Sequence, residues 1–301
     1  MRAVIVCAII YFHATASASD AQVTPILVGR GIWVQSPATA SEVELEAFQK
    51  LGARRLHFMV TSFRPYRTCA DNVRPIPKAK AARLVQLIKQ AQHLGFKVIA
   101  TLYVAPARDA IDSLLMKDGL ASAVVEAGVD GLEYDLEGEW SKSPVCGYSN
   151  HREAAQQLVA RSRELRERLP VGVTTHLGRA GDKKIGTEYF DWLAMQAYST
   201  CSIAKGCSSY DDRSGGPGYK QALVSRATSA FNGPVIVGLA AYHQRWPGHS
   251  IGEAMARSLK AVADAKTTDG RIVGHSYWSS SWLPAGSSQV NFLMETASSS
   301  P

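Results

Sequence analysis

The stretch Val129-Asp130-Gly131-Leu132-Glu133-Tyr134-Asp135-Leu136-Glu137 carries three carboxylates at alternate positions of an otherwise apolar segment. In a β-strand this spacing places Glu133, Asp135 and Glu137 on one face. A buried row of acids is costly, because like charges in a dry site cannot all stay ionised. The row therefore predicts chemistry in which one carboxyl is protonated beside another that is not. The alternative is an exposed edge strand with a solvated acidic face, whose apolar side would still need cover.

Apolar, β-branched runs alternate with amphipathic stretches along the rest of the chain, which is typical of βα units around a parallel sheet. The runs are Ile26–Val34, Arg55–Val60, Lys97–Val104, Gly131–Leu136, Val171–His176, Trp192–Ala197, Val235–Ala241 and Arg271–Trp278. Eight runs predict an α/β fold, a single-domain (β/α)8 TIM barrel over residues 19–297. A doubly wound sheet is the alternative, but no glycine-rich phosphate fingerprint follows an early run. In a barrel, functional residues are expected at the carboxyl ends of the strands.

Amphipathic stretches between these runs predict the helices. They are Glu42–Leu51, Ala79–Leu94, Ala110–Ala127, His151–Arg168, Tyr219–Phe231 and Ile251–Ala265, with a short piece at Thr187–Tyr189 and a closing segment at Val290–Thr296. Ser41 and Asn150 are expected to be N-caps. Glycines 52, 95 and 128 stand where helices should end.

The first residues have the layout of a secretory signal peptide. Arg2 supplies a positive start, residues 3–12 form a short apolar run, and Ala16-Ser17-Ala18 resembles a cleavage site. We therefore expect a signal peptide over residues 1–18, cleavage near Ala18, and a secreted or periplasmic protein with no membrane span. The Ser-rich end, residues 298–301, is expected to be a disordered tail.

Charge and cysteine content narrow the class of protein. The formal net charge of +7 suits an anionic surface such as a cell wall. The sequence has no Lys/Arg run and no interleaving of basic and aromatic residues, so we expect no nucleic-acid partner. Cys69, Cys146, Cys201 and Cys207 remain after the signal, and an even number in an exported chain predicts two disulfides. Cys201–Cys207 is the natural local pair and Cys69–Cys146 follows by elimination, although three connectivities are possible. A zinc site is the alternative, but the ligand spacings do not fit it.

The segment Asp130 to Glu137 resembles the fourth-strand signature of family-18 glycoside hydrolases, the chitinase family, whose pattern is Asp-Gly-x-Asp-x-Asp-x-Glu. The one departure is Glu133, where that family has Asp. Met195-Gln196-Ala197-Tyr198 looks like the sixth strand of the plant chitinase-lysozyme (hevamine-like) branch, and Tyr277-Trp278-Ser279 looks like the last strand.

This resemblance implies a role for each matched residue. Glu137 would be the general acid that protonates the glycosidic oxygen. Asp135 would orient the N-acetyl group of the substrate, which attacks the anomeric carbon in place of an enzyme nucleophile. Tyr198 would hydrogen-bond the acetamido carbonyl. Glu133 would be one of the substrate-binding residues and would adjust the charge on Asp135 from below. Trp278 would stack on the sugar.

Further residues are expected at the site from their positions near strand ends. Gln196 is either a substrate contact or a polar residue of a barrel layer. Tyr103, Tyr242 and His176 are expected to line the cleft. His57, inside the second run, is expected to be a hydrogen-bonded histidine of the barrel core. No metal or organic cofactor is expected, because the implied chemistry needs none.

The expected function is hydrolysis, with retention, of β-linked N-acetylhexosamine polymers such as chitin or peptidoglycan strands, by a monomer. Two alternatives stay open. One is a carbohydrate-binding barrel without catalysis, because the third run ends in Tyr103-Val104-Ala105-Pro106 where the family usually has Ser-x-Gly-Gly. The other is a glycosidase in which Asp135 or Glu133 attacks directly.

Overall fold

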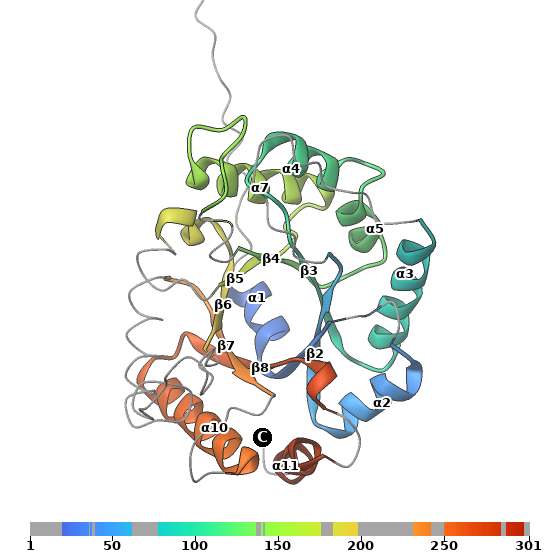
Figure 1. Cartoon of the computed structure of the whole chain (residues 1–301), viewed down its shortest axis with the longest axis vertical. Helices are drawn as coiled ribbons and strands as arrows, with labels where there is room; N and C mark the ends of the chain where they lie inside the picture. The colour runs from blue at the N-terminus through green and yellow to red at the C-terminus, as the bar shows by residue number, and fades with distance from the viewer. Residues whose placement is uncertain are drawn as a thin grey trace, which may run out of the picture.

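The protein is a closed barrel of eight parallel strands. The computed structural model describes residues 20–35, 37, 40–61, 78–136, 140, 142–175, 183–197, 231–241, 250–283 and 287–297. Within these residues the strands are hydrogen-bonded in chain order from β1 to β8, and β8 pairs with β1 to close the ring. The helices surround the strands (Figure 1). The predicted (β/α)8 TIM barrel is confirmed, and the doubly wound sheet is excluded by the closure.

Each predicted run overlaps one strand, and only β2 begins before its run, by two residues. The strands are β1 Gly29–Val34, β2 Ala53–Met59, β3 Lys97–Leu102, β4 Gly131–Asp135, β5 Val171–Thr175, β6 Trp192–Gln196, β7 Val235–Ala240 and β8 Ile272–Trp278. All five residues of β4 are buried and β4 pairs with β3 and β5, so the reading of this segment as an exposed edge strand is wrong.

The helices follow the predicted pattern with two differences. They are α1 Asp20–Leu27, α2 Glu42–Lys50, α3 Lys78–His93, α4 Arg108–Leu115, α5 Leu120–Glu126, α7 His151–Leu165, α10 Ile251–Thr268 and α11 Ser288–Ala297, with short 3₁₀ turns η2 Thr187–Tyr189 and η4 Ser280–Trp282. Most of the helix expected over residues 219–231 lies outside the described residues. The expected single helix Ala110–Ala127 is wrong: it is divided into α4 and α5 at Gly119, where a side chain would meet backbone carbonyls of residues 114 and 116.

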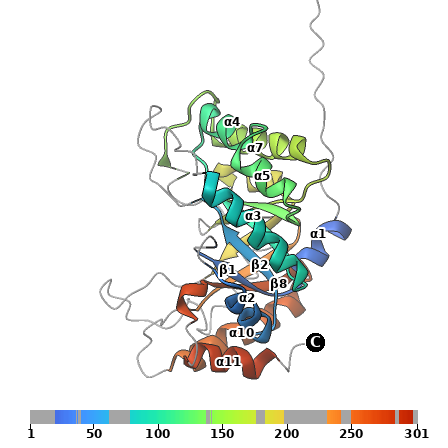
Figure 2. The ribbon, with the colours of Figure 1, turned by 90° about the vertical axis from the view of Figure 1, so that its right-hand side faces the viewer.

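The second difference is α1, a helix whose last two residues belong to the expected strand Ile26–Val34. Ile26 and Leu27 are helical, and β1 starts only at Gly29. Val23, Ile26 and Leu27 are buried and pack with Ile99 and Ile236 of the barrel interior. Figure 1 shows α1 over the centre of the barrel and Figure 2 shows it at one end, and α1 contacts β8. This helix therefore plugs the end of the barrel where the strands begin.

Local signals at the helix ends behave as expected. Ser41 caps α2 in a reciprocal capping box with Glu44, and the Asn150 side chain accepts the Glu153 N–H at the start of α7. Glycines 52, 95 and 128 have positive φ angles of 73°, 86° and 94°. This left-handed conformation ends the preceding helix at little steric cost because glycine has no Cβ.

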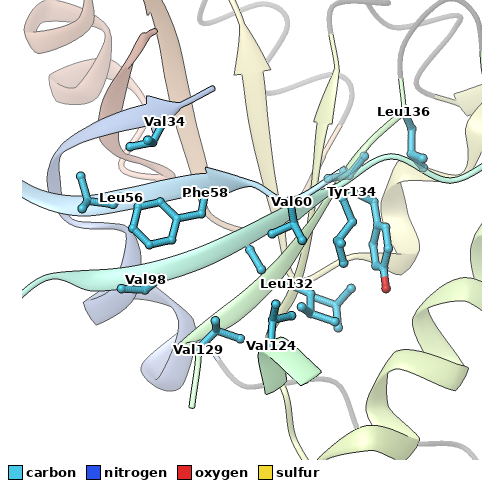
Figure 3. Packing of buried hydrophobic residues seen from close by; sticks show 14 of the residues in the cluster. Val34, Leu56, Phe58, Val60, Val98, Val124, Val129, Leu132, Tyr134 and Leu136 are labelled. Atoms are coloured by element: carbon cyan, nitrogen blue, oxygen red, sulfur yellow. The ribbon is translucent and has the colours of Figure 1, made fainter. Parts of the chain in front are cut away.

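The main hydrophobic core lies between the strands and the surrounding helices. Figure 3 shows part of it, where Leu56 and Phe58 of β2, Val98 of β3, and Leu132 and Tyr134 of β4 pack together. The Tyr134 hydroxyl lies 2.7 Å from Ser162 Oγ, which itself donates to Leu158 O, so Tyr134 ties β4 to α7. Because these side chains point outward, the side chains at the alternate positions of each strand fill the barrel interior.

A polar cluster on the outer face of the barrel connects β1 and β8 to α11. Buried Arg30 donates to Leu293 O at 2.8 Å and to Thr296 Oγ1 at 2.9 Å. Nearby, the ring of His275 lies edge-on to Tyr277, with centroids 5.5 Å apart, and its Nε2 atom is enclosed without a hydrogen-bond partner among the described residues. Desolvation, reinforced by Arg30 and Arg55, lowers the pKa of His275 to about 3.

His275 should make the protein acid-sensitive. The unfolded chain binds a proton near pH 6.5 and the folded chain only near pH 3, so the free energy of unfolding should fall by about 1.4 kcal/mol per pH unit as pH drops through this window. Urea denaturation at pH 6.5 and 4.5 should show this loss in the wild type and a smaller loss in His275→Gln. His93→Gln, at an exposed position on α3, is the control. Equal losses for the wild type and His275→Gln would contradict this assignment.

Candidate active site

Strand β4 presents the motif to the barrel interior by simple alternation. Glu133 and Asp135 point inward, whereas Leu132 and Tyr134 join the outer core. Asp130, the first residue of the motif, lies at the start of the strand and accepts the Val98 N–H at 2.8 Å. Asp130 therefore joins β3 to β4, at the end of the barrel opposite to the one expected to carry chemistry.

Glu133 lies at the centre of the barrel and is fully buried. Its Oε1 atom accepts from Trp33 Nε1 at 3.1 Å and Thr101 Oγ1 at 3.0 Å, and it lies 3.2 Å from His57 Nδ1. Its Oε2 atom accepts from Trp192 Nε1 at 3.2 Å. Four side chains from four strands thus satisfy one carboxylate. Both oxygens of Glu133 are engaged by these donors and no part of the side chain is exposed, so its expected influence on a substrate would have to act through Asp135 and stays a prediction.

His57 connects Glu133 to a buried cation. Arg55 Nε donates to His57 Nε2 at 2.9 Å, so the imidazole proton lies on Nδ1 and is donated to Glu133. Arg55 also donates to Ser276 Oγ at 2.9 Å and to the carbonyl oxygens of Ile26 and Leu27, which end α1. The expectation of a hydrogen-bonded core histidine is confirmed.

The charges within this network balance. Burial alone would raise the pKa of Glu133, but His57 and the two indole N–H groups hold it below the ordinary value, so the carboxyl is ionised. Burial lowers the pKa of His57, which is neutral. Burial also lowers the pKa of Arg55, to about 10, so Arg55 stays cationic at neutral pH. One anion and one cation therefore face each other across a neutral imidazole.

Glycines make room for these large side chains. A Cβ at position 172 would overlap the indole of Trp192, and one at position 131 would lie 2.9 Å from the same ring. A Cβ at position 31 would collide with Arg55 and Ser276. These inward-facing glycines let bulky donors reach the middle of the barrel, where Glu133 needs them.

Asp135 lies one layer nearer the carboxyl ends of the strands. It is 7% exposed, and Gln196 Nε2 of β6 donates to Asp135 Oδ1 at 3.4 Å and to Thr174 Oγ1 at 3.2 Å. The structure thus brings two predicted site residues, Asp135 and Gln196, together. Gln196 acts here as a polar residue of the barrel layer that orients Asp135.

Two more predicted residues lie in the described part of the site. Trp278 is half-buried at the end of β8, with its ring centroid 6.1 Å from that of Trp33. Tyr103 follows β3 and is 8% exposed. Its carbonyl accepts from Thr61 Oγ1 at 3.1 Å, which joins the ends of β2 and β3. Trp278 offers a ring to the barrel mouth, whereas most of Tyr103 is covered.

The remaining predicted site residues lie outside the described residues. These are Glu137, Tyr198, His176 and Tyr242, together with Cys69, Cys201 and Cys207. Cys146 is described and is disulfide-bonded, and the pairing stays a prediction. Among the described residues, no group of three or more His, Cys, Asp and Glu side chains could hold a metal ion. No helix in this part of the chain is long and apolar enough to cross a membrane.

Sequence reasoning misses five residues of the network around Glu133: Trp33, Arg55, Thr101, Trp192 and Ser276. Strand parity could have found them, because each occupies an inward position of its strand. The inward glycines opposite Trp192 were a second signal. Neither pattern shows that Trp33, Thr101 and Trp192 converge on one carboxylate, or that the others reach it through His57, since this depends on the register between strands.

Comparison with solved structures supports the fold. A family-18 (GH18) chitinase from Pseudoalteromonas aurantia is 17% identical with a TM-score of 0.55, covering 90% of this chain and 99% of its own. A GH113 β-1,4-mannanase is 10% identical with a TM-score of 0.61, covering 91% and 99%. The fold is that of a glycoside hydrolase-like TIM barrel.

The same barrel also resembles a protein of a different kind. A xylanase and α-amylase inhibitor protein from Scadoxus multiflorus is 16% identical with a TM-score of 0.55, covering 89% of this chain and 98% of its own. The sequence matches no protein-family model and no curated protein. At these identities the likeness concerns the fold alone.

Glu133→Asp should destabilise the protein, although it restores the residue of the chitinase signature. The shorter side chain cannot reach both indoles and His57, so buried donors lose their acceptor. We expect a loss of about 2–4 kcal/mol in the free energy of unfolding, measured by chemical denaturation. Glu126→Asp, at an exposed position on α5, should change it by less than about 0.5 kcal/mol. Unchanged stability of Glu133→Asp would refute the role given to the four donors.

Gly172→Ala tests the room made for Trp192. The added methyl overlaps the indole inside a rigid strand, so the variant should lose about 1–3 kcal/mol of stability and weaken the Trp192–Glu133 contact. Gly252→Ala in α10 meets nothing within 4 Å and should be neutral or slightly stabilising. Thermal melts and tryptophan fluorescence measure both effects. Equal melting temperatures for the two variants would show that the interior can accommodate the methyl.

Proposed function

We propose that the protein is a secreted glycoside hydrolase that cleaves β-linked N-acetylhexosamine polymers with retention. The observation that carries the proposal is the placement of Asp135. It lies at the carboxyl end of β4, above a fixed anion and oriented by Gln196 from β6. Function in this fold resides at that end of the barrel. The adjoining Glu137 continues the row toward the mouth by sequence.

The proposed chemistry uses the substrate as its own nucleophile. The Glu137 carboxylic acid gives its proton to the glycosidic oxygen while the bond from that oxygen to the anomeric carbon breaks. The acetamido oxygen of the same sugar forms a bond to that carbon. Water then attacks the anomeric carbon while the bond from that carbon to the acetamido oxygen breaks, and the water gives a proton to the Glu137 carboxylate. Two inversions therefore yield retention.

Asp135 and Gln196 have defined tasks in this scheme. Asp135 accepts the acetamido N–H and stabilises the positive charge that develops on that group. Gln196 holds the Asp135 carboxylate in place through the 3.4 Å contact. Glu133, satisfied by its own donors, contributes a fixed negative charge beneath Asp135 and takes no part in proton transfer. Tyr198 is proposed to bind the acetamido carbonyl.

Chitin and peptidoglycan strands are the proposed substrates. The predicted signal peptide favours a substrate outside the cytoplasm. The net charge of +7 for the whole chain favours an anionic surface such as a cell wall, and therefore peptidoglycan over uncharged chitin. A carbohydrate-binding barrel without catalysis is the second candidate. It is favoured by the end of the third strand, where Tyr103, Val104 and Ala105 are at most 8% exposed and replace the small residues typical of chitinases.

Hydrolysis of chito-oligosaccharides and purified peptidoglycan tests the proposal. The wild type should release reducing ends from at least one of these substrates. Asp135→Asn and Glu137→Gln should each lower kcat by about 10²–10⁴-fold, because each removes a group that acts in the transition state. Glu167→Gln, at a glutamate whose side chain is 89% exposed, should keep full activity.

Each other outcome has a distinct meaning. If the wild type binds chito-oligosaccharides but cleaves neither substrate, the carbohydrate-binding barrel is correct. Full activity of Glu137→Gln would show that a different group is the acid. A product of inverted configuration, determined by NMR during the first turnovers, would exclude the acetamido group as nucleophile.

A further inference from the structure

Gln35 lies at the mouth of the barrel, where β1 ends. It has the same strand parity as Gly31, which faces Arg55, and Trp33, which donates to Glu133. Gln35 therefore continues the inward column of β1 one layer above Trp33. Trp33 is the register partner of Trp278 on β8, so Gln35 and Trp278 stand at the same corner of the mouth. Unlike the residues below it, Gln35 is exposed.

Hydroxyl groups after β8 hold the amide of Gln35. Ser281 Oγ donates to Gln35 Oε1 at 3.0 Å. Ser279 Oγ lies 3.3 Å from the same oxygen and 2.9 Å from Ser281 Oγ. Ser279 is buried and Ser281 belongs to η4, so the packed turn that follows β8 holds both hydroxyls in position. The amide oxygen is thus engaged, and among the described residues none accepts a hydrogen bond from Gln35 Nε2.

This arrangement presents an oriented N–H donor beside a half-buried tryptophan. An indole ring packs on the apolar face of a sugar, and a neighbouring amide can bind a hydroxyl or carbonyl oxygen at the edge of that sugar. Orienting the amide in advance lowers the entropy lost when it binds. If no ligand bound at this corner, water could accept the hydrogen bond from Gln35 Nε2. The two serine hydroxyls that fix the amide would then have no role in binding.

We propose that Gln35 is a substrate-contact residue that donates a hydrogen bond from Nε2 to a hydroxyl or acetamido oxygen of the sugar stacked on Trp278. Ser279 and Ser281 act as positioning residues, because they reach the substrate only through Gln35. The inference rests on the proposed function, since it requires a saccharide at the mouth of the barrel. It adds a specificity determinant from β1, a strand that carries no part of the recognised motifs.

Gln35→Glu is the sharpest test, because it keeps the length of the side chain and an oxygen for the two serines but removes the N–H donor. All proteins in this test carry Glu137→Gln so that the probe, chitotetraose, is not cleaved. The dissociation constant of the Gln35→Glu variant for chitotetraose should rise about tenfold, measured by titration calorimetry. Gln35→Ala should show a similar loss. Ser281→Ala should lose about threefold, because it loosens the amide without removing it. Gln156→Glu, at an exposed position on α7, adds the same charge elsewhere and should bind as the wild type does.

Three results would count against the inference. If the wild type binds chitotetraose and both Gln35 variants bind it equally well, Gln35 is no contact and the proposed function stands. If Gln35→Ala binds normally and only Gln35→Glu is impaired, the added charge is responsible and the donor has no role. If the wild type binds neither chitotetraose nor peptidoglycan fragments, the proposed function and this inference fail together.

Discussion

One carboxylate, that of Glu133, has to be kept ionised in the dry centre of the barrel, and much of the interior follows from this requirement. An isolated buried anion would be very costly, so it needs hydrogen-bond donors and a compensating charge. Two indoles, a hydroxyl and an imidazole supply the donors, and Arg55 supplies the charge. Because these side chains are large, small residues must stand opposite them. The same guanidinium also binds the last carbonyls of α1, which connects the plug to the centre of the barrel.

This arrangement separates structure from chemistry along a single strand. Glu133, the deepest acid of β4, binds side chains of several strands and stabilises the barrel. Asp135, the next acid toward the mouth, is hydrogen-bonded to Gln196 of β6. Glutamate in place of the aspartate of the chitinase signature is then understandable, because its extra methylene lets one carboxylate reach partners on several strands. The departure concerns support beneath the site. It gives no reason to assign a different chemistry to the residues above it.

The alternation of apolar runs and amphipathic stretches was sufficient to predict the eight strands. Within each strand, odd or even position decides whether a side chain faces the helices or the interior. The alternation was not sufficient for α1, whose short apolar sequence contains Pro25 and continues directly into that of β1. The position of a candidate site residue was predictable where it follows local spacing, as for Asp135 at the carboxyl end of β4. The partners of Glu133 were not predictable, because Trp33 and Trp192 lie 100 and 59 residues away in the chain and meet it only through the register of a closed barrel.

The position of α1 has a practical consequence for handling the protein. The described chain starts at the end of the barrel where the strands begin, whereas Gln35 and Trp278 stand at the opposite end. A tether joined ahead of α1 would therefore orient an immobilised barrel with its mouth away from the support. The mouth would then face the solution and stay clear of the surface to which the protein is attached.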